Sequence, residues 1–171
     1  MANTYTLIQA QTLASAAATV TFSSIPATYT DLVLQLSARS TSASAYQNLQ
    51  IEFNGSAASN YSMTWLLGTG SAASSARQAA TTEGWVGDID AATSTANTFA
   101  SLEIYIPNYA SSNKKPFSSF SVQETNATAA NIKTQALLWG LTNAITSIRF
   151  KPDGGNLDIG SSFYLYGIKN S

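Results

Sequence analysis

The chain has 171 residues, a net charge of −1 and only 10% charged residues, and it contains neither histidine nor cysteine. This length predicts one domain over residues 1–171 with a hydrophobic core of its own, and the scattered basic residues exclude the basic stripe typical of nucleic-acid-binding proteins. Because histidine is the side chain best suited to proton transfer near neutral pH and cysteine is the most reactive nucleophile and softest metal ligand, we expect no enzymatic activity, no cofactor and no metal site.

No stretch of the chain resembles a membrane segment. The longest run of small apolar residues, near 14–18, is far shorter than the roughly 20 residues that a bilayer helix requires. The first residues lack the basic start and the apolar stretch of a secretory signal. We therefore expect synthesis in a cytoplasm without export by that route, and no contact with a membrane.

Apolar residues recur at every second position in a series of short segments, which is the pattern of half-buried strands. No segment has a convincing amphipathic helical pattern, and about nine or ten strands are expected. The clearest lie at 18–22, 32–37, 49–54, 61–67, 101–106, 118–123, 132–139, 145–151 and 162–168. This pattern predicts an all-β, single-domain, two-layer antiparallel β-sandwich of jelly-roll-like type, with a closed barrel as the alternative.

Turn and loop signals separate these strands. Asn54-Gly55 directly follows a strand and is a strong hairpin signal. Gly167 lies inside the last strand, where it predicts a bulge or a close backbone contact. Residues 37–46 and 68–82 lack strand periodicity, so both are expected to be surface loops, the second with a short helical turn at most.

Two pairs of acidic residues are the main candidates for chemistry. Asp88 and Asp90 lie on one face of an extended segment, and Asp153 and Asp158 are close in sequence. Paired carboxylates can bind Ca²⁺ or act as an acid and base, but the spacing of an EF-hand is missing and a solvated loop is the simpler interpretation. The chain also lacks the Gly-x-Ser-x-Gly nucleophile turn. We therefore assign no catalytic or metal-binding residue.

The three tryptophans raise the alternative of carbohydrate binding, because sugar sites on β-sandwiches use exposed aromatic faces. Trp65 and Trp139 lie in apolar strands and are expected in the core. Trp85 is flanked by Gly84 and Gly87, and is the tryptophan we expect at an interface.

Several segments, taken in order, resemble a class of virion proteins of tailed bacteriophages. They are Tyr5-Thr6-Leu7-Ile8-Gln9-Ala10-Gln11-Thr12-Leu13, Val20-Thr21-Phe22-Ser23-Ser24-Ile25-Pro26, Tyr29-Thr30-Asp31-Leu32-Val33-Leu34, Phe53-Asn54-Gly55-Ser56, Ile106-Pro107-Asn108-Tyr109-Ala110 and Phe163-Tyr164-Leu165-Tyr166-Gly167-Ile168-Lys169-Asn170. The similarity covers most of the chain, although no single motif is diagnostic. It implies a structural role in the virion more clearly than a position in the particle.

Within that class the chain is most similar to a head decoration, or cement, protein. The resemblance implies a homotrimer on the capsid surface that bridges subunits of the major capsid protein, with no nucleic-acid partner. A receptor-binding domain of a tail fibre or baseplate is the first alternative, and a carbohydrate-binding β-sandwich module is the second.

Segments that are poor in core pattern yet contain isolated large residues are our candidates for partner contacts. They are the possible N-terminal strand at residues 1–13 and the expected loops at 37–46 and 68–82. The candidate contact residues are Tyr5, Leu7, Arg39, Tyr46, Arg77 and Trp85.

Overall fold

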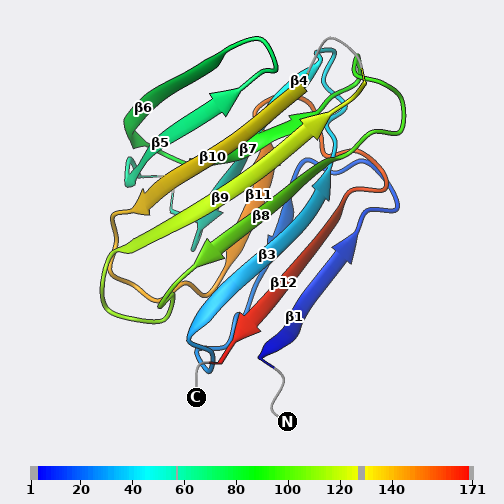
Figure 1. Ribbon diagram of the computed structural model, residues 1–171. Coiled ribbons are helices and arrows are strands. Elements are labelled where there is room, and N and C mark those ends of the chain that lie inside the picture. The colour runs from blue at the N-terminus through cyan, green and yellow to red at the C-terminus, as the bar shows by residue number, and fades with distance from the viewer. Residues whose placement is uncertain (1–3, 57, 127–129, 170–171) are drawn as a thin grey trace.

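The computed structural model describes residues 4–56, 58–126 and 130–169, so Met1–Asn3 of the predicted contact segment lie outside the described residues. The described residues form twelve strands and no helix. In chain order the strands are β1 (Tyr5–Thr12), β2 (Val20–Phe22), β3 (Asp31–Ala38), β4 (Tyr46–Phe53), β5 (Tyr61–Gly68), β6 (Ala73–Thr81), β7 (Gly84–Asp90), β8 (Ala100–Ile106), β9 (Lys115–Glu124), β10 (Ala130–Trp139), β11 (Ile148–Pro152) and β12 (Ser162–Ile168) (Figure 1).

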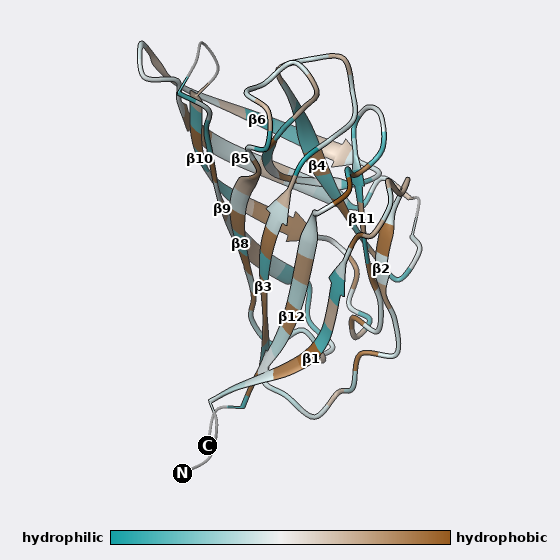
Figure 2. Ribbon diagram, turned by 90° about the vertical axis from the view of Figure 1, so that its right-hand side faces the viewer, coloured by the Kyte–Doolittle hydropathy of each residue, from teal (hydrophilic) through white to brown (hydrophobic). Residues whose placement is uncertain are grey.

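The strands make two sheets that pack face to face, which confirms the predicted two-layer antiparallel β-sandwich. The large sheet has eight strands in the order β1-β12-β3-β8-β9-β10-β5-β6, and the small sheet has four in the order β2-β11-β4-β7. The chain crosses repeatedly from one sheet to the other, as in a jelly roll. Figure 2 shows the two layers nearly edge-on, with β4, β11 and β2 on one side of the molecule. The large sheet therefore has one face on the core and one free face.

The expected loop at 68–82 is mostly strand. β6 pairs with β5 over its whole length, with an irregularity near Ala80, whose φ is 56°. Its sequence of alanine and serine has no apolar alternation because β6 is the outermost strand of the large sheet and most of its side chains are exposed on both faces. A strand without an inward apolar face leaves no period-two signal. Likewise, the expected loop at 37–46 begins later, because β3 continues to Ala38.

The core lies between the sheets, and the alternation predicts most of its residues, although Phe120 faces outward. Trp139 is fully buried, as expected, and its ring lies edge-on to Phe53 with centroids 5.5 Å apart. Phe117 meets the same Phe53 ring at 5.3 Å. Trp65, also expected in the core, is only partly buried and packs against its margin. The aromatic cluster fixes the end of the sandwich where β4, β9 and β10 face one another.

Three tyrosines should make the fold sensitive to alkali. Burial raises the pKa of Tyr61, whose hydroxyl accepts a hydrogen bond from the Phe53 amide at 2.7 Å. Burial also raises the pKa of Tyr109, and the hydrogen bond from Tyr105 to Asp31 raises that of Tyr105. A group whose pKa rises on folding stabilises the fold below its unfolded pKa, and this stability is lost as pH rises further.

We therefore expect the free energy of unfolding to fall as pH rises above about 10, by up to about 1.4 kcal/mol per pH unit for a buried group such as Tyr61. Lys115, whose pKa burial lowers, contributes an opposite slope, but it is one group against three. Urea unfolding at a series of alkaline pH values measures the effect. Tyr61→Phe should flatten the slope, and a level or rising curve in the parent chain would contradict the prediction.

Candidate functional site

The free face of the large sheet carries the two surface features of interest, and strand register explains how they arise. One register row places Tyr164, Gln35, Glu103, Phe120, Thr134, Leu66 and Ser75 side by side on β12, β3, β8, β9, β10, β5 and β6. Directly opposed residues of neighbouring strands point to the same side of a sheet. Residues from distant parts of the sequence therefore form one continuous outer surface.

The first feature is an apolar patch made by Leu66, Phe120 and Ile132. Their side chains are 60%, 45% and 53% exposed, although each is large and apolar. They border a shallow hollow of about 320 Å³ whose other lining residues are uncharged, namely Leu67, Gly68, Ala73, Ser74 and Thr134. Scattered exposed apolar residues are ordinary, but a contiguous group on one face is typical of an interaction surface.

The second feature is a polar groove beside this patch. It has a volume of about 580 Å³ and crosses four neighbouring strands, β12, β3, β8 and β9. Its side chains are those of Gln35, Ser37, Ser101, Glu103, Phe120, Ser162 and Tyr164, with Leu36 and Leu102 beneath. Phe120 belongs to both features, so the patch and the groove are continuous.

Four of the predicted contact residues are exposed. Tyr5 and Leu7 are 54% and 52% exposed on the edge strand β1, and the Tyr5 ring lies edge-on to Tyr166 at 6.4 Å. Leu7 is directly opposite Tyr166 in the register. Arg77 is exposed on β6, at the other edge of the same sheet, and Tyr46 is exposed at the start of β4. Tyr5, Leu7 and Arg77 thus lie at the two edges of the large sheet.

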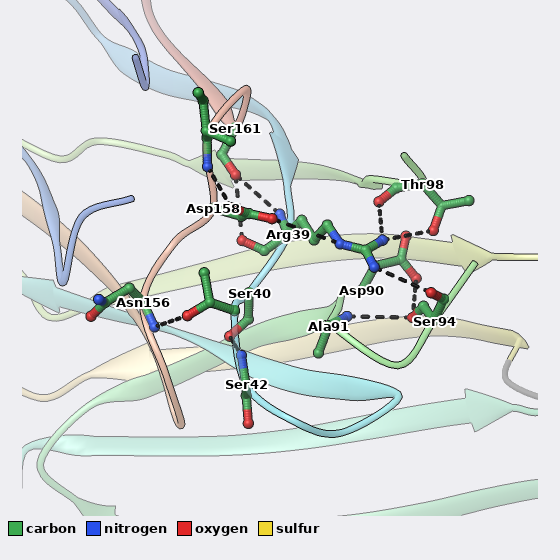
Figure 3. A network of polar contacts seen from close by, with 12 residues as sticks. Arg39, Ser40, Ser42, Asp90, Ala91, Ser94, Thr98, Asn156, Asp158 and Ser161 are labelled. Atoms are coloured by element: carbon green, nitrogen blue, oxygen red, sulfur yellow. Dashed lines mark hydrogen bonds and ion pairs between the residues drawn. The ribbon is translucent and has the colours of Figure 1, made fainter. Parts of the chain in front are cut away.

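The structure gives Arg39 an internal role. Its guanidinium is buried and donates hydrogen bonds to the carbonyls of Thr95 at 2.9 Å and Thr98 at 2.8 Å (Figure 3). Ser94 accepts a further bond at 3.2 Å, and Asp158 lies 3.9 Å from Nε. These contacts hold the connection between β7 and β8, and they leave the guanidinium little surface to offer a partner.

Trp85 is half-buried and is used within the protein. Its ring centroid is 6.3 Å from that of Trp65, and its carbonyl accepts a hydrogen bond from Gln135 at 2.8 Å. These contacts join the edge of the small sheet to β5 and β10 of the large sheet. Trp85 is thus a packing residue between the two layers.

The acidic pair Asp88 and Asp90 is buried within β7, whereas a solvated loop was the expectation. Asp88 forms an ion pair with Lys133 at 3.0 Å, and the Asn131 amide donates to its other oxygen at 3.2 Å. The Lys133 ammonium also donates to Asn48 at 3.3 Å. Gly84 and Gly87 interrupt the apolar alternation of this segment, so the sequence gives no clear strand signal here. For that reason the inward orientation of both carboxylates was not predicted.

Metal ligation, membrane segments and similarity to known proteins complete the description of the chain. No group of three acidic side chains there is close enough to hold a metal ion. Nor does any described segment form a helix that could span a membrane. Comparison with protein-family models, curated proteins and solved structures finds no match.

Proposed function

We propose that the chain is a non-enzymatic structural protein of a phage virion, which binds the outside of the capsid and stabilises the shell by bridging major capsid subunits. The apolar patch of Leu66, Phe120 and Ile132 is the observation that carries this proposal. An uncharged group of large exposed side chains on a rigid sheet suits a protein that acts through contact. The choice of the major capsid protein as the partner rests on the resemblance to tailed-phage virion proteins.

Burial of the patch would supply much of the binding free energy. A large apolar side chain that passes from full exposure to burial contributes about 1.5–3 kcal/mol. Three half-exposed side chains therefore contribute a substantial part of the binding free energy of a specific contact. Many symmetry-related copies on a shell would multiply this effect. The low charge of the chain supports the same role, because few ions would need to be desolvated at the contact.

The edge strand β1 offers a second contact. Its inner side pairs with β12, and its other side has no strand neighbour within the part of the chain that the structure describes. A free strand edge can pair with a strand of a partner, with Tyr5 and Leu7 presented beside it. The homotrimer implied by the resemblance would use such contacts, and light scattering of the purified chain across micromolar concentrations tests it.

The proposal is tested on particles of the phage that encodes the chain. Antibody labelling in electron micrographs should cover the whole head, and the purified chain should rebind particles from which it has been stripped. The Leu66→Ser, Ile132→Ser double variant should rebind at least about tenfold more weakly, because it removes most of the patch. Thr64→Ser, a change on the same face outside the patch, should rebind like the parent chain.

Two results would contradict this function. Label at a single vertex would indicate a tail protein, and particles that lack the chain would exclude any virion role. If the chain covers the head but the double variant rebinds as tightly as the parent chain, the contact with the capsid lies outside the patch.

A further inference from the structure

We propose that the polar groove is a binding site for a neutral saccharide. This inference does not depend on the proposed function, because its polar side chains lie on β12, β3 and β8, outside the apolar patch, although Phe120 belongs to both features. It assigns a ligand class to the hollow of about 580 Å³ on the free face of the large sheet.

The polar side chains of the groove are not used by the fold. Within the described residues, the side chains of Gln35, Ser37, Ser101, Glu103 and Ser162 make no hydrogen bond or ion pair with the rest of the protein. Polar side chains between the sheets behave differently, since Gln135 donates to Trp85 and also to Ser119. The groove thus presents a row of donors and acceptors that are free for a ligand.

These groups match the edge of a sugar ring. A carboxamide supplies two donors and one acceptor, a carboxylate supplies acceptors, and each serine hydroxyl both donates and accepts. Gln35 and Glu103 are directly opposed on adjacent strands, about 4.8 Å apart. Ser162, Ser37 and Ser101 form a second row roughly 7 Å further along the strands. Vicinal hydroxyl groups can bridge such closely spaced amide and carboxylate groups.

Aromatic rings stand at the two ends of the first row. Tyr164 and Phe120 are three strand spacings apart, about 14 Å, with Gln35 and Glu103 between them. A pyranose ring has an apolar face of C–H groups, which packs on an aromatic side chain in the same way as other apolar surface. The serines of the second row have small side chains, so the groove stays open beside Gln35 and Glu103. A short oligosaccharide can therefore contact a ring at each end.

Charge decides against other ligands of similar size. Among the described residues that line the groove, Glu103 is the one with a charged side chain, and none is a lysine or arginine. A phosphate, a nucleotide or a sulfated sugar would be repelled by this carboxylate and would find no cation. A purely apolar ligand would bury Gln35 and Glu103 without partners, which costs free energy. A neutral, hydroxyl-rich molecule satisfies the groove, and 580 Å³ lies within the usual range for small-ligand sites.

The test begins with an array that carries neutral, sialylated and sulfated oligosaccharides, followed by NMR titration of the labelled protein with the neutral glycans retained. We expect retention of neutral glycans and saturable shifts at Gln35, Ser101 and Glu103. Gln35→Ala and Glu103→Ala should each weaken binding at least tenfold. Ser75→Ala lies in the same register row outside the groove, so it should bind like the parent chain.

Because Gln35 and Glu103 are exposed and make no hydrogen bond or ion pair with other described residues, these variants should fold normally, and the NMR spectrum verifies this directly. An array on which no neutral glycan is retained would overturn the proposal, as would preferential retention of the anionic ones. Equal affinity of the parent chain and both groove variants would also overturn it. Rebinding to stripped particles should not change in Gln35→Ala, which separates this site from the capsid contact.

Discussion

Replacing Gly87 by alanine should destabilise the fold by on the order of 3 kcal/mol, because the new methyl group has no room and the backbone conformation opposes it. Gly87 lies in β7 with φ at +147°, where a register irregularity interrupts the pairing of β7 with β4. A Cβ atom at this position would lie 2.4 Å from Cβ of Ser121 and 2.9 Å from Cδ2 of Leu102. The inner faces of β8 and β9 therefore approach the β7 backbone too closely for any side chain.

A second glycine separates the steric clash from the cost of the backbone conformation. Gly70 also has a positive φ, +80°, but a Cβ there would meet no atom within 4 Å. Gly70→Ala should therefore cost only the backbone term, about 1 kcal/mol. Urea unfolding of both variants measures the difference, and a coupling energy between Gly87→Ala and Ser121→Gly would identify the clash directly. Equal costs for the two glycine variants would contradict the steric explanation.

The close approach of β7 also explains which part of the fold could be predicted. The alternation at 118–123 correctly predicts strand β9, but the rule that apolar side chains face inward would place Phe120 in the core. Phe120 faces out, and Ser119 and Ser121 face the small sheet instead. At Ser121 only a small side chain fits, because Gly87 brings the β7 backbone against it. Strands with ordinary partners, such as β8, follow the simple rule.

The candidate site depends on register, which the sequence does not encode locally. Gln35, Glu103 and Tyr164 lie on three strands that are far apart in the sequence, and each looks like an ordinary outward residue of its own segment. Their proximity follows from the order β12-β3-β8 in the large sheet. Tyr5 and Leu7 could be proposed as exposed residues because they lie in the first strand, which alternates poorly. Arg39 could not be recognised as internal, since the carbonyls that bind it belong to the connection at Ser94–Thr98.

Removing the carboxylate of Asp88 should cost about 3–5 kcal/mol, because it would leave the Lys133 ammonium buried without its counter-charge. Both side chains are buried between β7 and β10, with Nζ and Oδ1 3.0 Å apart. Asn48 is a neutral acceptor at 3.3 Å, and the Trp65 ring lies 5.3 Å from Nζ. Neither replaces a carboxylate at a site where both charged side chains are buried.

The ion pair of Lys151 and Glu83 is the matched comparison. Its atoms are 2.8 Å apart, but the two side chains are 33% and 19% exposed, so solvent can replace a lost partner. Glu83→Ala should therefore cost about 1 kcal/mol or less. Urea unfolding of Asp88→Ala and Glu83→Ala under the same conditions compares the two sites.

The double variant Asp88→Leu, Lys133→Met distinguishes a buried charge from lost packing. If the cost of Asp88→Ala comes from the unpaired ammonium, removing both charges should restore much of the stability, although Asn48 and Asn131 lose their partners. The double variant should then be more stable than Asp88→Ala by on the order of 1–3 kcal/mol. A double variant no more stable than the single one would mean that the pair joins the two sheets through its hydrogen bonds to the asparagines, and not through charge.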